Sequence, residues 1–132
     1  MSTCLLQEGT ASLKLSCKSD GSGDYSASLE VRVAGYAGNA DGHVVGADWT
    51  AFANAMRGLE ESREGDAELR SAIPGEFQVR VRSIDSRSQI GVSGVLLCRV
   101  GVDESPHQEL RFSFEVDSSK LPEFARCVAL VK

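Results

Sequence analysis

The run Phe77-Gln78-Val79-Arg80-Val81-Arg82 alternates apolar and polar side chains. A period of two is typical of a strand with one face in the core and the other in water. Residues 90–100 and 110–116 keep the same period. Turns are expected at Pro74-Gly75 and over residues 85–88, where proline, glycine and short polar side chains favour chain reversal. The centre of the chain is therefore predicted to be an antiparallel β-meander.

The segments before this meander also predict short strands. Residues 12–17, 28–33 and 67–71 alternate in the same way. Asp41-Gly42 is typical of a tight hairpin turn, so Val44-Val45 is expected to pair back onto the preceding strand.

Two segments change to the helical period. Trp49, Phe52, Met56 and Leu59 form an apolar stripe, with Asp48 as the expected N-cap and Gly65 as the stop. Ser119 is the expected cap of a second helix, in which Pro122 is tolerated in the first turn. We therefore predict an α+β fold in one domain, residues 1–132. It has a mostly antiparallel sheet of about seven short strands, and two helices near 48–62 and 119–129 pack on it.

Composition favours an ordinary globular protein. The chain has 132 residues, of which 42% are hydrophobic and 25% charged, and a net charge of −5. Such a balance supports solubility and argues against binding nucleic acid through its phosphates. We see no targeting segment and no apolar run of about 20 residues. We therefore expect a cytoplasmic protein that does not bind a membrane.

The cysteines are four, Cys4, Cys17, Cys98 and Cys127, and none forms a Cys-x-x-Cys pair. Nothing in the sequence indicates an oxidising compartment, so all four thiols are predicted to be free. Cys17 and Cys98 share the parity of core residues and should react slowly with thiol reagents.

Catalytic and metal-binding motifs are scarce. His43 and His107 have no ligand partner at metal-site spacing and are expected to be surface residues. The loop Asp20-Gly21-Ser22-Gly23-Asp24 begins like a calcium loop, but Tyr25 and Val31 stand where an EF-hand needs Gly and Glu. No catalytic residue, metal or cofactor is expected.

Charged residues suggest two surfaces. The polar parity of the strands carries mixed charges, which predicts a solvated sheet face with cross-strand ion pairs or, alternatively, a surface for an anionic ligand. Its members are Lys14, Arg32, Arg80, Arg82, Arg99, Arg111, Glu30, Glu109 and Glu115. Four acidic residues around the end of the first helix could dock a basic partner, although an exposed helix end would look the same. They are Glu60, Glu61, Glu64 and Asp66.

Taken together, the layout resembles the WapI-family immunity proteins of bacterial polymorphic-toxin and contact-inhibition systems. The resemblance rests on the helix 49–59, on the strand entry Gly65–Ser71, and on several later segments. These are Glu76–Val81 with Asp85, Val92–Leu96, Leu110–Asp117, and Leu121-Pro122 with Phe124.

The resemblance implies a small cytoplasmic antidote that binds and blocks a cognate toxin without catalysis, and it transfers no toxin-contacting residue. We expect the free protein to be monomeric. The alternatives are a small enzyme whose site is assembled only in space, or a generic protein-interaction domain.

Overall fold

A computed structural model describes residues 2–72, 76–84, 89–99 and 107–131 of the chain. The turns expected at Pro74-Gly75 and over residues 85–88 lie outside the described residues. Within the described ranges the chain forms eight strands, two α-helices and one 3-10 turn. In order these are β1 (Ser2–Glu8), β2 (Ala11–Ser19), β3 (Tyr25–Val33), β4 (Tyr36–Val44), α1 (Gly46–Ser62), β5 (Asp66–Arg70), β6 (Phe77–Ser83), β7 (Gln89–Arg99), β8 (His107–Asp117), η1 (Ser118–Lys120) and α2 (Leu121–Ala129).

The strands form two antiparallel sheets, each in sequence order. The first sheet is β1-β2-β3-β4 and the second is β5-β6-β7-β8. This architecture confirms the predicted α+β class, with the antiparallel strands divided between two sheets. The strand beyond the expected seven is β1, which buries Cys4 and Leu6 and pairs along its length with β2.

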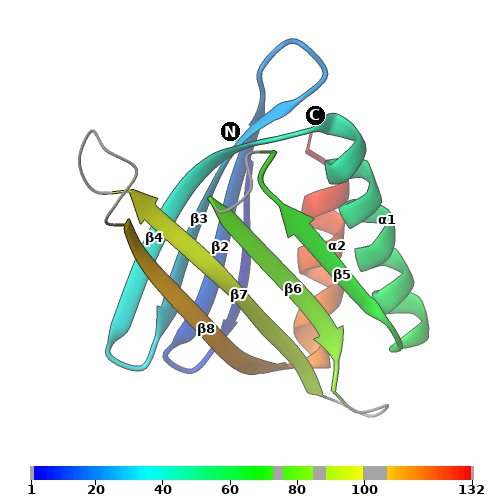
Figure 1. Cartoon of the computed structure of the whole chain (residues 1–132). Helices are drawn as coiled ribbons and strands as arrows, with labels where there is room; N and C mark the ends of the chain where they lie inside the picture. The colour runs from blue at the N-terminus through cyan, green and yellow to red at the C-terminus, as the bar shows by residue number, and fades with distance from the viewer. Residues whose placement is uncertain (1, 73–75, 85–88, 100–106, 132) are drawn as a thin grey trace.

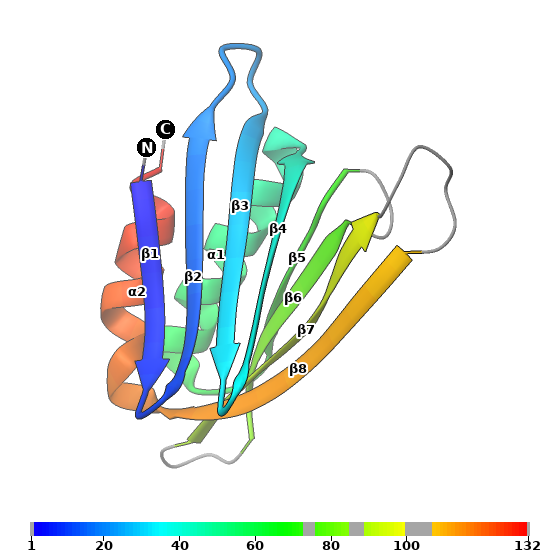
Figure 2. The same ribbon diagram turned by 90° about the vertical axis from the view of Figure 1, so that its left-hand side faces the viewer.

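Figure 1 shows sheet β5–β8 in front of sheet β1–β4, with both helices to one side of the sheets. Helix α1 contacts β5, helix α2 contacts β1, and the helices contact each other. The turned view in Figure 2 shows the sheets converging at one end and diverging at the other. The inner faces of both sheets and the apolar stripes of both helices form one continuous core. None of the described helices is long and apolar enough to cross a membrane.

Both helix starts differ from the expectation. Helix α1 begins at Gly46 after the extended residue Val45, so Asp48 lies in its first turn and is not the N-cap. Instead, the Asp24 carboxylate accepts a hydrogen bond from the Gly46 amide at 2.8 Å. Before α2, the Asp117 side chain accepts a hydrogen bond from the Ser119 amide. Asp117 is therefore the capping residue, and Ser119 is not. A tertiary contact can therefore replace the local cap that sequence spacing indicates.

The hairpin turn between β3 and β4 also lies elsewhere than predicted. It falls at Ala34-Gly35, and Asp41-Gly42 lies inside β4. A Cβ atom on Gly42 would approach the Phe77 ring to 2.9 Å. Gly42 therefore permits close packing of the two sheets and does not form a turn.

The prediction of four free thiols is wrong. Cys4 and Cys127 form a disulfide between β1 and α2, with their Cα atoms 5.6 Å apart, a usual separation for such a bond. The sequence does not reveal that these residues, 123 positions apart, are neighbours. Cys17 is free and buried as expected, and its burial raises the pKa of the thiol to about 11. The Cys98 side chain lies outside the described part of the structure.

Candidate functional sites

The four acidic residues expected to bind a partner cluster around the end of α1. Glu60 and Glu61 lie in its last turn, and Glu64 and Asp66 follow in the connection to β5. Glu60 is half-buried, while the other three are exposed. Asp66 binds Arg80 of β6, with Nε 2.8 Å from Oδ2, so its charge already has a partner. We call the remaining three, Glu60, Glu61 and Glu64, the acidic helix end.

The acidic helix end has no cation of its own among the described residues. Arg63, the nearest basic residue in sequence, turns its guanidinium to the Ser118 carbonyl at 3.2 Å. No basic residue lies in the last turn of α1. Carboxylates at a helix C-terminus oppose the helix dipole, which costs roughly 0.3–1 kcal/mol each. Glu60 and Glu61 therefore weaken the helix in which they lie.

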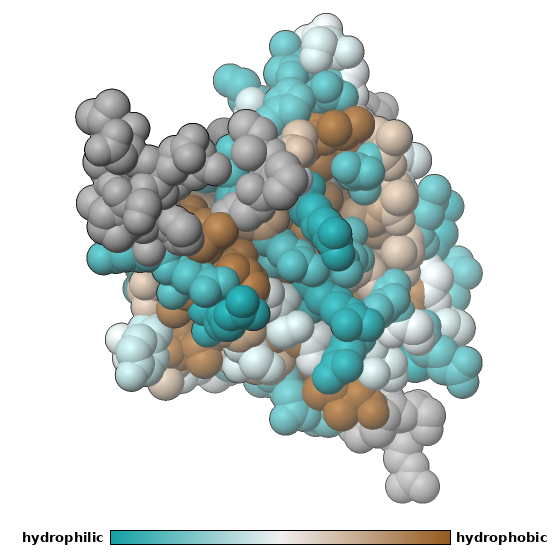
Figure 3. Space-filling model, in the orientation of Figure 1, coloured by the Kyte–Doolittle hydropathy of each residue, from teal (hydrophilic) through white to brown (hydrophobic). Residues whose placement is uncertain are grey.

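The outer face of sheet β5–β8 carries the mixed charges, and one cross-strand ion pair of the expected kind is present among its described residues, between Arg80 of β6 and Asp66 of β5. The other two pairs, Arg70 with Glu68 and Arg111 with Glu109, each join residues of one strand. A hollow of about 370 Å³ lies on this face, lined by Arg70, Ser71, Phe77, Gln78, Val95, Leu97, Glu109 and Arg111. Figure 3 shows hydrophilic side chains across the middle of the molecule on this side, with smaller hydrophobic patches beside them. The Arg99 side chain lies outside the described part.

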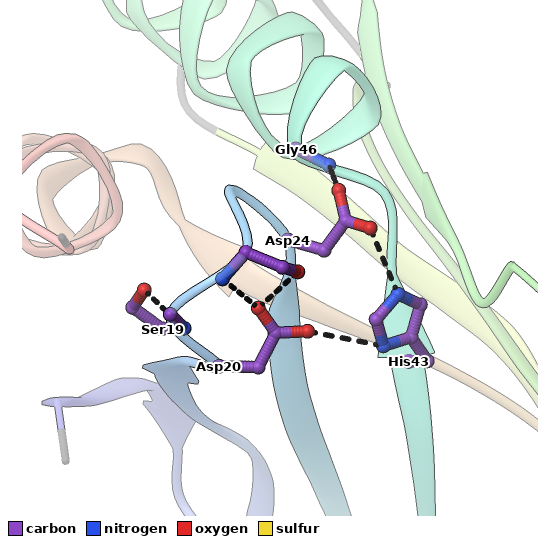
Figure 4. A network of polar contacts seen from close by, with 7 residues as sticks. Ser19, Asp20, Asp24, His43 and Gly46 are labelled. Atoms are coloured by element: carbon purple, nitrogen blue, oxygen red, sulfur yellow. Dashed lines mark hydrogen bonds and ion pairs between the residues drawn. The ribbon is translucent and has the colours of Figure 1, made fainter.

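A third group of polar residues joins three distant segments (Figure 4). Asp20 and Asp24 come from the loop between β2 and β3, His43 from the end of β4, and Gly46 from the start of α1. His43 Nε2 lies 3.1 Å from Asp24 Oδ2, and its Nδ1 lies 3.7 Å from Asp20 Oδ2. Ser22 donates its amide and hydroxyl hydrogens to Asp20 Oδ1, at 2.8 and 2.6 Å.

These hydrogen bonds lower the pKa of both carboxyl groups. For Asp20 the main causes are the Ser22 hydroxyl and amide; for Asp24 they are the Gly46 amide and then His43. Both side chains are therefore ionised at neutral pH. Both ring nitrogens of His43 face carboxylates, so neither faces a hydroxyl or thiol, as catalysis by a nucleophile–His–acid triad requires. One ligand atom from each of Asp20, Asp24 and His43 lies within 4.8 Å of the others, which is close enough to hold a metal ion.

Sequence reasoning missed this cluster because it depends on strand register. The expected surface histidine, His43, pairs opposite Ser26 and is thereby brought beside Asp24. The loop from Asp20 to Asp24 does not form the cluster by itself, as an EF-hand loop forms its own calcium site. Its two carboxylates form the cluster together with His43 of β4. The side chain of His107 lies outside the described part.

Acid is expected to weaken the fold through this cluster. Because the pKa values of Asp20 and Asp24 are lowered from 3.8 on folding, the unfolded chain binds these protons more tightly. Their stabilisation is therefore complete above the unfolded pKa and is lost as the pH falls through the folded pKa. Thermal melts from neutral pH to about pH 2 should show a falling midpoint in the wild type and a shallower fall in Asp24→Asn. Asp41→Asn, an exposed control on β4, should retain the wild-type slope. Equal slopes in the wild type and Asp24→Asn would contradict this assignment.

No family model matches the chain, and no curated protein or solved structure matches it.

Proposed function

We propose that the protein is an immunity protein that binds a cognate bacterial toxin and blocks it without catalysis. The observation that carries this proposal is the acidic helix end. Three carboxylates without an ion-pair partner among the described residues crowd the C-terminal end of a helix, where the dipole disfavours them. A contribution to binding explains why they stand where they weaken the fold.

The same carboxylates suit a basic partner. A toxin that acts on nucleic acid needs a basic cleft, and an acidic patch can occupy such a cleft and speed association. Six of the charged residues on the face of β5–β8 are already paired with each other, so a partner that binds them would have to replace existing ion pairs. This contrast favours the acidic helix end over the mixed-charge sheet face.

The remaining parts of the proposal follow from the resemblance and the charge. The partner is a protein, and neither nucleic acid nor a membrane is bound. The free chain is a monomer in the cytoplasm, and it needs no cofactor to bind its toxin. A generic interaction domain or a small enzyme remains the alternative, and the acidic helix end would then have no effect on toxin binding.

Charge reversal of the acidic helix end is expected to abolish tight binding. The variant Glu60→Lys/Glu61→Lys/Glu64→Lys should bind the toxin domain encoded by the neighbouring reading frame about 100-fold more weakly, if each contact contributes about 1 kcal/mol. It should also unfold at a higher temperature, because each lysine in the last turn favours the helix dipole. Calorimetry measures the affinity, and thermal melts measure the stability.

A matched control separates local charge from net charge. The variant Asp41→Lys/Glu115→Lys/Glu123→Lys reverses three exposed acidic residues on other elements and should bind nearly as tightly as the wild type. Equal loss in both variants would exclude the acidic helix end as the docking site. Failure of the wild-type protein to bind the neighbouring toxin domain, or to protect cells from it, would refute the immunity function.

A further inference from the structure

We propose that Asp20, Asp24 and His43 form a binding site for a divalent transition-metal ion, for which Zn²⁺ is the best match. The site is independent of the immunity function and is tested without any toxin. One imidazole and two carboxylates are donors that zinc accepts, and three protein ligands leave further positions for water.

The spacing of the donors suits such an ion. His43 Nε2 and Asp24 Oδ2 lie 3.1 Å apart, and neighbouring ligands of a tetrahedral zinc ion with bonds of about 2.0–2.1 Å lie roughly 3.3 Å apart. Asp20 Oδ2 lies 3.7 Å from the other ring nitrogen. The two carboxylates face different ring nitrogens, so binding an ion requires the ring to rotate until one nitrogen is directed between them.

The two carboxylates are held in the way that metal ligands usually are. In each, Oδ1 accepts hydrogen bonds from the protein: Asp24 Oδ1 from the Gly46 amide and Asp20 Oδ1 from Ser22. In each, Oδ2 is directed toward His43. Hydrogen bonds on the oxygen that does not bind the ion orient a ligating carboxylate and favour its ionised form. Both ligands are therefore positioned before an ion arrives.

Charge and access also favour a cation. The two ionised carboxylates give the cluster two negative charges when His43 is neutral, and a divalent ion balances them. The side chains of His43, Asp24 and Asp20 are 43%, 35% and 24% exposed, so an ion can reach them from solvent.

A neighbouring hollow adds a further acidic group. It has a volume of about 480 Å³, and its lining includes Asp41, His43 and Glu76. The Oε2 atom of Glu76 is buried and accepts no hydrogen bond in the described part of the chain. An unpaired carboxylate oxygen therefore belongs to a residue that lines the same hollow as His43.

An ion at this position would join three segments. Asp20 and Asp24 lie in the β2–β3 loop, His43 ends β4, and Asp24 also contacts the first amide of α1. Binding should therefore raise the melting temperature, since an ion that binds only the folded chain stabilises it.

Titration calorimetry with Zn²⁺ on metal-free protein, in a buffer that does not bind zinc, tests the site. We expect one ion per chain and a rise in melting temperature with Zn²⁺ that reverses with a chelator. His43→Ala and Asp20→Asn should each weaken binding by about 100-fold, the upper end of the loss that is usual when a group supporting a metal ligand is removed. His107→Ala, which removes the other histidine of the chain, should bind like the wild type.

Circular dichroism of each variant without metal separates a lost ligand from a lost fold. Asp20→Asn keeps the shape of the side chain and is the second variant in case His43→Ala unfolds. Absence of one-to-one binding in the wild type would overturn the proposal. Equal affinity in the wild type and in a folded His43→Ala or Asp20→Asn variant would also overturn it.

Discussion

Reduction of the Cys4–Cys127 disulfide is expected to lower the free energy of unfolding by about 4 kcal/mol. The bond closes a loop with a sequence separation of 123. Closing a loop of that size lowers the conformational entropy of the unfolded chain, which stabilises the folded state by up to about 5 kcal/mol. Denaturant unfolding with and without reductant measures the difference as a shift in the midpoint.

The variant Cys4→Ser is the matched control. Its free energy of unfolding should be as low as that of the reduced wild-type protein, and adding reductant should not change it. A wild-type protein that is equally stable with and without reductant would contradict the prediction. Because glutathione keeps cytosolic thiols reduced, the Cys4–Cys127 disulfide and the proposed cytoplasmic location lead to opposite expectations. Alkylation at the moment of cell lysis decides between them: trapped thiols on Cys4 and Cys127 would support the cytoplasm, and an intact bond would count against it.

The meander and helix α1 were predictable because local pattern alone specifies them. In β6 and β8 each apolar side chain that faces the core is followed by a polar one that faces water. The stripe from Trp49 to Leu59 lies on one side of α1 and is fully buried. In these elements the apolar positions of the sequence are the buried positions of the structure, so the sequence period alone predicts the burial pattern.

The missed strand and the misplaced turn have a different cause. In β1, the outward-facing Leu5 is 49% exposed beside the buried Leu6, which breaks the expected alternation. In β4, small residues face inward, and a Cβ atom on Gly38 would come within 2.6 Å of Leu110 in the second sheet. A glycine that is needed because another sheet lies close to it cannot be distinguished, in the sequence alone, from a glycine in a turn.

The error at the turn also concealed the polar cluster. With the turn at Ala34-Gly35, Tyr25 pairs with Val44, which places His43 beside Asp24. A turn at Asp41-Gly42 would have placed His43 opposite residues just before the turn, which in the structure lie in the same strand, β4. The acidic helix end was visible from the sequence, because residues close together along the chain at one helix end do not depend on strand register. The ion pair between the neighbouring Asp66 and Arg80 was not visible, since it crosses between strands.

The substitution Phe52→Ala is expected to destabilise the protein by about 3–5 kcal/mol, the usual result of removing a buried aromatic side chain. Phe52 is 1% exposed, and its ring lies 6.0 Å from that of Trp49 in the preceding turn of α1. Because core atoms are close-packed, the neighbours cannot fully close the space that the ring leaves. Urea unfolding should show a lower midpoint with an unchanged slope.

Tyr36→Ala is the control for the loss of an aromatic ring at the surface. Tyr36 is 73% exposed, so its loss should change stability by less than about 0.5 kcal/mol. A loss below about 1 kcal/mol in Phe52→Ala would mean that α1 does not pack on the core through this residue.

Helix α1 carries the acidic helix end at its C-terminus, and its first amide donates a hydrogen bond to Asp24 at its N-terminus. If Phe52 fixes this helix, Phe52→Ala should therefore weaken toxin binding and zinc binding together, whereas Glu60→Lys should affect only the first and His43→Ala only the second.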